Sequence, residues 1–232
     1  MQTFSVHGIA ASSGIAIGKV QLVSNALQEV EHYKIKKSGL DSEINRLSKA
    51  ILIVKNDLSN IKKDIKKKSS DDFSSFIDIH LMMLEDKNFS FYPQEIIKLE
   101  LCNAEWAIKT QLDLVISKFD AIDDLYIKER KLDVTQVAER LIKILLGHQN
   151  KKISKKNYRS TILVAHDISP ADALQFKHHN YAAFITEHGG ANSHTAILAR
   201  GLSIPSLVAV KNARKLINNN DLVIVDGDSG LA

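Results

Sequence analysis

The most regular pattern of apolar and polar positions lies between residues 41 and 65. Apolar side chains recur there at alternating steps of three and four: Ile44, Leu47, Ile51, Val54, Leu58, Ile61 and Ile65. This spacing places one apolar stripe along one face of a helix. Ser38 or Asp41 can cap its start, and the lysines at 66–68 suit the negative end of the helix dipole. The pattern therefore predicts one long amphipathic helix.

Three further helical segments follow this helix. They span residues 73–84, 104–119 and 125–146; Pro93 interrupts the chain after the first, and Gly147 ends the last. Four such segments are typical of a helical bundle. Apolar residues at alternating steps of three and four also fit a coiled-coil dimer. One such helix among several nevertheless favours packing within the chain.

Strand-like runs lie on both sides of this helical block. Two precede it, at 3–6 and 15–23, around a glycine- and serine-rich turn at 8–14. The others follow it, at 161–165, 181–186, 206–210 and 222–226, with helical candidates at 170–176 and 194–201. Such alternation is typical of an α/β domain. The early strands need a sheet to join, so the sequence predicts a mixed α/β fold. Residues 1–24 and 148–232 form a discontinuous α/β domain, and 37–147 form an inserted domain of four-helix type.

Composition narrows the class of protein. The chain has 232 residues, of which 44% are hydrophobic and 25% charged, as in ordinary globular proteins. Cys102 is the single cysteine, which excludes an internal disulfide or a cysteine-based zinc site and fits a reducing compartment. The chain begins without a signal-peptide pattern and has no apolar run of membrane-spanning length. We therefore expect a cytoplasmic protein without membrane contact.

The formal net charge of +4 does not predict nucleic-acid binding. Its lysine clusters lack the interleaved aromatic residues that a base-stacking surface needs. The histidines at 166, 178, 179 and 188 match no metal-site spacing, so we expect no metal site.

Residues 187–200 carry the candidate chemistry. Gly189 and Gly190 permit a sharp turn, and Ser193 is a plausible N-cap that would place His194 in the first turn of a helix. Unpaired N–H groups at a helix start favour anions and disfavour a charged imidazolium. A neutral imidazole beside an anion site suits nucleophilic attack on a phosphoryl group. Alternatively, such a histidine is an ordinary surface or core residue.

The string GG-x-x-SH-x-A-I-x-A-R at 189–200 resembles the phosphohistidine signature of phosphoenolpyruvate-utilising enzymes. Residues 8–18, 76–86, 126–134 and 164–170 resemble the N-terminal half of Enzyme I of the bacterial phosphoenolpyruvate:sugar phosphotransferase system. The resemblance implies a phosphoenolpyruvate-protein phosphotransferase that serves sugar uptake.

The resemblance also assigns roles to residues of the candidate site. It implies that His194 is phosphorylated on Nε2 and that Ser169 bonds the other ring nitrogen, Nδ1. Such a bond would set the tautomer of the attacking imidazole. Gly189, Gly190 and the N–H groups around Thr195 would cradle the phosphoryl oxygens during an in-line transfer.

By the same resemblance, the helical domain docks the small carrier protein HPr. The matching positions are Asp71, Asp72, His80, Met83, Glu85 and Arg130. Each also has a structural reading: the aspartates can cap a helix, Arg130 can pair with Glu129 or Asp133, and His80 can be a core residue as readily as a docking one. Met83 can equally pack in the core.

Three positions depart from the Enzyme I pattern. Ala191 and Asn192 replace an Arg-Thr pair, which removes a candidate anion-binding arginine, and Phe73 replaces a lysine. The C-terminal half of the family, a barrel domain that binds phosphoenolpyruvate and Mg²⁺ and mediates dimerisation, has no counterpart in this chain. We therefore expect a monomer without a cofactor that exchanges phosphoryl groups with HPr, and Mg²⁺ and dimerisation only in the full-length enzyme.

Two other functions stay open at this point. The histidine string also occurs in the mobile phosphohistidine domain of pyruvate-phosphate dikinases and phosphoenolpyruvate synthases, although the inserted helices and the opening at residues 8–18 argue against them. A non-catalytic helical interaction module is an alternative of another class.

Overall fold

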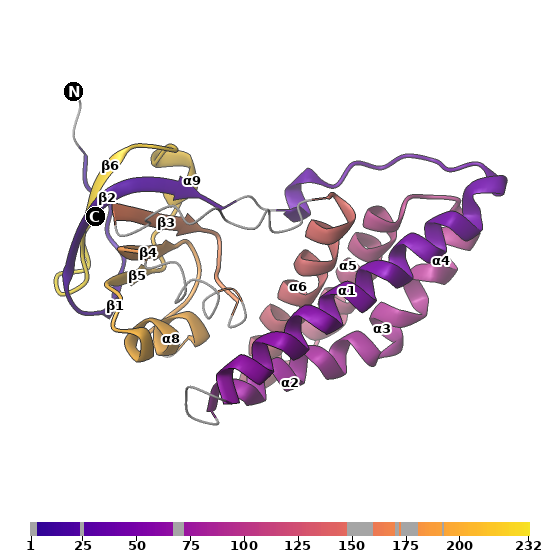
Figure 1. Cartoon of the computed structure of the whole chain (residues 1–232), viewed down its shortest axis with the longest axis horizontal. Coiled ribbons are helices and arrows are strands. Elements are labelled where there is room, and N and C mark those ends of the chain that lie inside the picture. Colours follow the sequence, from indigo (N-terminus) through magenta and orange to yellow (C-terminus); the bar gives the residue numbers. More distant parts are fainter. Residues whose placement is uncertain are drawn as a thin grey trace. The chain divides into compact units, whose positions relative to one another are not determined.

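The computed structural model describes residues 4–23, 26–66, 72–147, 160–169, 172, 181–191 and 193–232. The chain divides into two compact units (Figure 1). One unit, the α/β unit, joins Met1–Asn25 to Ile153–Ala232, and the other, the helical unit, is Ala26–Lys152. Within the described residues, no helix combines the length and apolar character that crossing a membrane requires. The fold is mixed α/β, as the sequence predicts.

The described part of the α/β unit contains a six-stranded sheet in the order β1-β5-β4-β3-β2-β6. The strands are β1 (Ile9–Ser12), β2 (Ile15–Leu22), β3 (Thr161–Ala165), β4 (Ala183–Thr186), β5 (Ser206–Val208) and β6 (Leu222–Asp226). Strands β2, β3, β4 and β5 pair in parallel, whereas β1 and β6 pair antiparallel at the two edges. The N-terminal strand β2 thus completes a sheet whose other parallel strands follow the helical unit in sequence.

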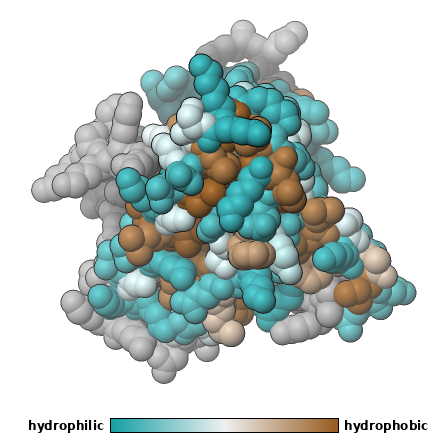
Figure 2. All heavy atoms as spheres, turned by 90° about the vertical axis from the view of Figure 1, so that its right-hand side faces the viewer, coloured by the Kyte–Doolittle hydropathy of each residue, from teal (hydrophilic) through white to brown (hydrophobic). Residues whose placement is uncertain are grey.

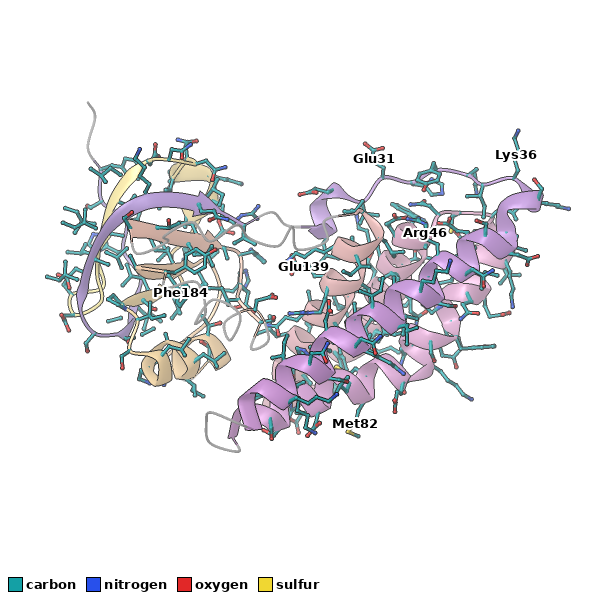
Figure 3. All side chains as sticks on the ribbon, viewed as in Figure 1. Glu31, Lys36, Arg46, Met82, Glu139 and Phe184 are labelled. Carbon is teal, nitrogen blue, oxygen red and sulfur yellow. The ribbon has the colours of Figure 1, made fainter. Side chains whose placement is uncertain are left out.

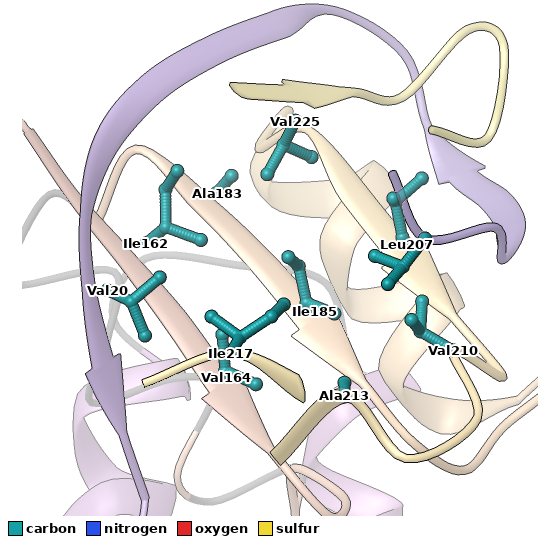
Figure 4. Packing of buried hydrophobic residues seen from close by; sticks show 11 residues of the cluster. Val20, Ile162, Val164, Ala183, Ile185, Leu207, Val210, Ala213, Ile217 and Val225 are labelled. Carbon is teal, nitrogen blue, oxygen red and sulfur yellow. The ribbon is translucent and has the colours of Figure 1, made fainter. Parts of the chain in front are cut away.

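The apolar core of this unit lies against the sheet (Figure 4). Every residue of β4 is buried, as are the last four residues of β3. Parallel strands covered on both faces have continuous apolar runs rather than alternating ones. The same core takes residues from both sides of the helical unit, among them Val20, Ile162, Val164, Ile185 and Val225.

The predicted strand at residues 3–6 is wrong over its described part. Val6 exchanges backbone hydrogen bonds with Ala232, but residues 4–6 form no strand. The first strand, β1, lies instead inside the stretch interpreted as a turn. A Cβ on Gly8 would lie 2.5 Å from Val210 Cγ2 and 2.9 Å from Val208 O. Glycine therefore lets the chain pass close to β5 at the start of β1, where the sequence suggested only a turn.

Four helices of the helical unit agree with the sequence. They are α1 (Leu40–Lys66), α2 (Asp72–Glu85), α5 (Ala104–Asp120) and α6 (Leu125–Leu145). Two more, α3 (Lys87–Ser90) and α4 (Tyr92–Glu100), occupy the region that Pro93 was expected to interrupt. Pro93 lies in the first turn of α4, where its missing N–H is not needed. This proline therefore begins a helix.

The apolar stripe of α1 is buried within the unit. Leu47, Val54 and Leu58 are almost fully inaccessible, and α1 contacts α2, α4, α5 and α6. This is the intramolecular packing favoured over a coiled-coil dimer. Arg46 lies on α1 (Figure 3). It donates 2.6 and 2.7 Å hydrogen bonds to the two carboxylate oxygens of Glu105 on α5. An ion pair thus reinforces the contact between these helices.

Candidate active site

Helix α8 (His194–Leu202) starts at the cap that the sequence predicts. Ser193 has an extended backbone, and its Oγ accepts a 3.3 Å hydrogen bond from the Ala196 N–H. His194 is therefore the first residue of the helix. Its side chain lies outside the described side chains, so the structure places this residue by its backbone alone. That position is where helix N–H groups lack intrahelical partners and favour an anion.

The two glycines before the helix differ in their surroundings. Gly189 has φ of +113°, and a Cβ there would lie 3.0 Å from Ser193 Oγ and 3.3 Å from Val208 Cβ. A Cβ on Gly190 would have no atom within 4 Å. Gly189 is thus required by the backbone and by close packing, whereas Gly190 faces open space.

Thr195 holds the start of α8 against the segment that follows β3. Its buried hydroxyl lies 3.1 Å from two acceptors, Asp167 Oδ1 and the Ile168 carbonyl oxygen. Its one hydrogen is shared between them. The hydroxyl is therefore engaged within the protein, and a contribution of Thr195 to phosphoryl binding would come from its N–H. These contacts also bring residues 167–169, including Ser169, next to the helix start.

Ser169 is buried and interacts with Asp172, a residue that the sequence analysis did not single out. The hydroxyl donates to Asp172 Oδ2 at 2.7 Å and accepts from the Asp172 N–H at 3.2 Å. Because a carboxylate only accepts, the hydroxyl hydrogen points toward Asp172. The spacing S-x-x-D was the available signal, since it is typical of a helix-capping pair. The bond between Ser169 and His194 stays a prediction.

A pair of histidines lies at the carboxyl ends of β3 and β4. The rings of His166 and His188 are 4.3 Å apart between centroids, and His166 Nδ1 lies 2.9 Å from Glu187 Oε2. Burial raises the pKa of the Glu187 carboxyl, but hydrogen bonds from His166 and from the Arg214 N–H outweigh burial and lower that pKa. Among the described residues, no group of three or more histidine, cysteine or acidic side chains is arranged to hold a metal ion.

Arg200, in the last turn of α8, holds the loop that precedes the helix. Its Nη1 donates to the Ala191 carbonyl at 2.9 Å and to the Ala11 carbonyl of β1 at 3.1 Å. This arginine therefore links the loop, the helix and the edge strand. Asn192, the other residue that departs from the Enzyme I pattern here, lies outside the described residues.

The candidate partner-binding residues of the helical unit have different surroundings. Asp71 lies outside the described residues, and the side chains of Asp72 and Phe73 are likewise not described. Glu85 is exposed and Met83 is half-buried. These placements leave the predicted role of Met83 and Glu85 in docking open.

His80 and Arg130 both lie near the carboxylate of Asp133. The His80 side chain is 3% exposed, with Nε2 3.9 Å from Asp133 Oδ1. Of the two interpretations that the sequence left open for His80, core residue or docking residue, its burial supports the core one. Arg130 donates to Asp133 Oδ2 at 3.0 Å, the pairing weighed from the sequence.

Family models match both units of the chain. Residues 7–130 match the N-terminal domain of PEP-utilising enzymes, and residues 158–230 match their mobile domain, where PEP is phosphoenolpyruvate. Two similar proteins, both named phosphoenolpyruvate-protein phosphotransferase, come from Cupriavidus necator and Geobacillus stearothermophilus. They are 40% and 36% identical over 98% and 97% of this chain. The chain spans 40% and 39% of their respective lengths.

Solved structures share the fold. A solution structure of an Enzyme I protein matches with a TM-score of 0.71 and 32% identity, covering 98% of this chain and 92% of that one. The N-terminal domain of a protein titled Enzyme 1 - Nitrogen matches with a TM-score of 0.68 over the same shares, and its 23% identity supports the fold alone.

Proposed function

The chain belongs to the family of PEP-utilising enzymes, and from that premise we propose that it is the phosphohistidine-bearing part of a phosphoenolpyruvate-protein phosphotransferase. His194 carries the phosphoryl group in this proposal. The observation that supports it most is the position of His194 directly after the N-cap Ser193, at the start of α8. Unpaired N–H groups at a helix start attract phosphoryl oxygens.

The proposed reaction exchanges one phosphorus–nitrogen bond for another. The Nε2 lone pair of His194 attacks the phosphorus carried by the histidine of HPr. The bond to the imidazole of HPr breaks, and its electron pair returns to that ring. Because the bond formed and the bond broken are of the same kind, the transfer runs in both directions with a small free-energy change. Positioning and charge stabilisation by N–H groups supply the catalysis.

Residues of the α/β unit position the His194 imidazole and the phosphoryl oxygens in this proposal. Ser169 bonds Nδ1 of His194, and Thr195 fixes the helix start through Asp167 and the Ile168 carbonyl. Gly189 allows the loop to turn close to the cap, while Gly190 leaves space for the phosphoryl oxygens. In the longer relatives, loading from phosphoenolpyruvate would use Mg²⁺ outside this chain.

The helical unit docks HPr in this proposal, with Asp71, Asp72, Met83, Glu85 and Arg130 as candidate contacts. His80 is not among them, because its side chain is buried. The cytoplasm is the compartment that fits the single buried cysteine, Cys102.

Phosphoryl transfer from phosphorylated HPr tests the proposal. We expect the chain to become phosphorylated when mixed with phospho-HPr and to remain unmodified with phosphoenolpyruvate and Mg²⁺ alone. His194→Ala should abolish transfer and keep binding to HPr. His7→Ala, which removes an exposed histidine of the same unit, is the matched control and should transfer normally. Phosphorylation of the His194→Ala variant would refute the assignment.

The same experiment separates the alternatives. A non-catalytic interaction module would bind HPr without becoming phosphorylated. A dikinase-type mobile domain would show neither binding to HPr nor transfer from it. The relatives named phosphoenolpyruvate-protein phosphotransferase match nearly the whole chain, including the helical unit, which favours exchange with HPr over both alternatives.

A further inference from the structure

The carboxylate of Glu187 joins three segments of the α/β unit. Glu187 itself follows β4 directly. Its Oε2 lies 2.9 Å from Nδ1 of His166, which follows β3, and its Oε1 accepts a 3.0 Å hydrogen bond from the Arg214 N–H in α9 (Ala213–Leu216). Burial raises the pKa of this carboxyl, but the hydrogen bonds outweigh burial and lower it, so the group is ionised at neutral pH. Because a carboxylate only accepts, His166 Nδ1 is the donor in this pair.

His166 in turn holds the loop that leads from β4 to α8. Strands β3 and β4 run side by side in parallel, so His166 and His188, which we name the histidine pair, lie at the same end of the sheet (Figure 4). The His166 carbonyl accepts a 3.0 Å hydrogen bond from the His188 N–H, and the two rings are 4.3 Å apart between centroids. The Thr186 hydroxyl donates to the His188 carbonyl at 2.7 Å. Both backbone groups of His188 are thus fixed where the loop leaves the sheet.

Two contacts connect the histidine pair to the start of α8. Gly189 directly follows the second histidine, and a Cβ on it would lie 3.0 Å from Ser193 Oγ, which caps the helix. Asp167 directly follows the first histidine, and its Oδ1 lies 3.1 Å from the Thr195 hydroxyl. His194 lies between the two contacted residues in sequence. Its backbone is therefore held on both sides by neighbours of the histidine pair.

We propose that Glu187 is a positioning residue for phosphoryl transfer: through His166 it holds the loop before α8 and so fixes the start of the helix that carries His194. The inference rests on the proposed function and names what orients its nucleophile. A hydrogen bond to an ionised carboxylate is stronger than one between neutral groups, which suits such an anchor. Precise anchoring matters because a displacement of about 1 Å can slow a positioned reaction about a hundredfold.

Glu187→Gln tests this role, and Asp226→Asn is its matched control. Asp226 ends β6, and its Oδ1 accepts hydrogen bonds of 2.9 and 3.1 Å from the Asp228 and Ser229 N–H groups. Strand β6 runs antiparallel to β2, whereas β4 runs parallel to it through β3, so Asp226 and Glu187 lie at opposite ends of the strands. Each substitution removes one negative charge from a carboxylate that holds a loop, but only Glu187 lies at the end next to α8.

Single-turnover transfer from phospho-HPr separates positioning from docking. In Glu187→Gln the maximal rate constant should fall about tenfold, while the phospho-HPr concentration for half the maximal rate should stay within about twofold. The proposed HPr contacts belong to the helical unit, on whose surface apolar residues appear among hydrophilic ones (Figure 2), and the substitution leaves that surface unchanged. Asp226→Asn should change both quantities by less than about twofold. Lost stability alone does not slow transfer, because a less stable unit remains folded under native conditions.

A double-mutant cycle shows whether Glu187 acts through His166. His166→Ala should slow the maximal rate about as much as Glu187→Gln, because either change breaks the same contact. The double variant should then be within about twofold of the slower single variant. Multiplication of the two effects to about a hundredfold would show that the residues act separately, and it would overturn the inference.

Hydrogen exchange at the start of α8 reports on positioning without any partner. The Ser193 N–H donates to the Gly190 carbonyl at 3.0 Å, and the Ala196 N–H donates to Ser193 Oγ at 3.3 Å. Both amides should exchange about tenfold faster in Glu187→Gln and within about twofold of the unchanged chain in Asp226→Asn.

Several results would refute the positioning role. Transfer by Glu187→Gln within about twofold of the unchanged chain is one, and equal slowing in Asp226→Asn is another. A loss confined to the half-saturating concentration would assign Glu187 to docking instead. These results leave the proposed function standing. Absence of transfer from phospho-HPr in the unchanged chain overturns the proposed function, and the exchange rates of Ser193 and Ala196 then decide the inference: equal rates in the two variants overturn it, and faster exchange in Glu187→Gln alone supports it.

Discussion

Replacing Gly189 by alanine tests whether the loop before α8 depends on a glycine. The backbone of Gly189 has φ of +113°, a region that side chains with a Cβ rarely adopt. The added Cβ would also lie 3.0 Å from Ser193 Oγ, the atom that caps α8. The substitution therefore strains the backbone and displaces the cap at the same time.

Both effects have known magnitudes. A non-glycine residue in a sparsely populated backbone region costs about 1–3 kcal/mol, and a weakened serine cap costs about 1 kcal/mol. We expect Gly189→Ala to destabilise the α/β unit by about 2–4 kcal/mol and to slow phosphoryl transfer. Gly190→Ala is the matched control. Its φ is not in the positive region and its Cβ would meet no atom within 4 Å, so its stability should change by less than about 1 kcal/mol.

The assay must report on the α/β unit separately, since the single tryptophan, Trp106, lies in the helical unit. Native-state hydrogen exchange at the amides of β4 and β5 gives the free energy of opening for that unit. Transfer from phospho-HPr, measured on the same samples, gives the functional effect. Equal opening free energies for the two alanine variants would refute the argument that Gly189 is required by the backbone and the cap.

The remaining predictions concern Glu105, whose side chain is 5% exposed and paired with Arg46. Arg46→Ala leaves this carboxylate without its cation and should lower the free energy of unfolding of the helical unit by about 3 kcal/mol. Urea unfolding followed by Trp106 fluorescence measures this change, and a decrease below about 1 kcal/mol would contradict the expectation. Burial raises the pKa of Glu105, but hydrogen bonds from Arg46 and Asn103 outweigh burial and hold that pKa below its usual range. The pair therefore stabilises the fold above the unfolded-state pKa, about 4.3, and this stability is lost as pH falls through the lower folded-state pKa. Urea midpoints measured between about pH 6 and pH 3 should show this loss in the unchanged chain and a smaller one in Arg46→Gln.

Features set by neighbouring residues could be predicted from the sequence. The three-four spacing from Ile44 to Ile65 predicts α1, and Ser193 followed by an apolar helix predicts the cap of α8. Continuous apolar runs predict the buried strands β3 and β4. Periodicity and capping are local properties, because each depends on side chains within a few positions of one another. The position of His194 at a helix start, on which the proposed chemistry depends, is of this kind.

Only the tertiary structure decided which distant residues meet. The stretch from Gly8 to Gly14 had the composition of a turn, yet Ile9–Ser12 form an edge strand because β5, far along the chain, pairs with them. His80 had two equally good interpretations until packing against α6 buried it. His166 and His188 are separated in sequence and become neighbours because β3 and β4 pair in parallel and end at the same edge. Burial and proximity of this kind depend on how all the elements pack at once, and no local spacing encodes that arrangement.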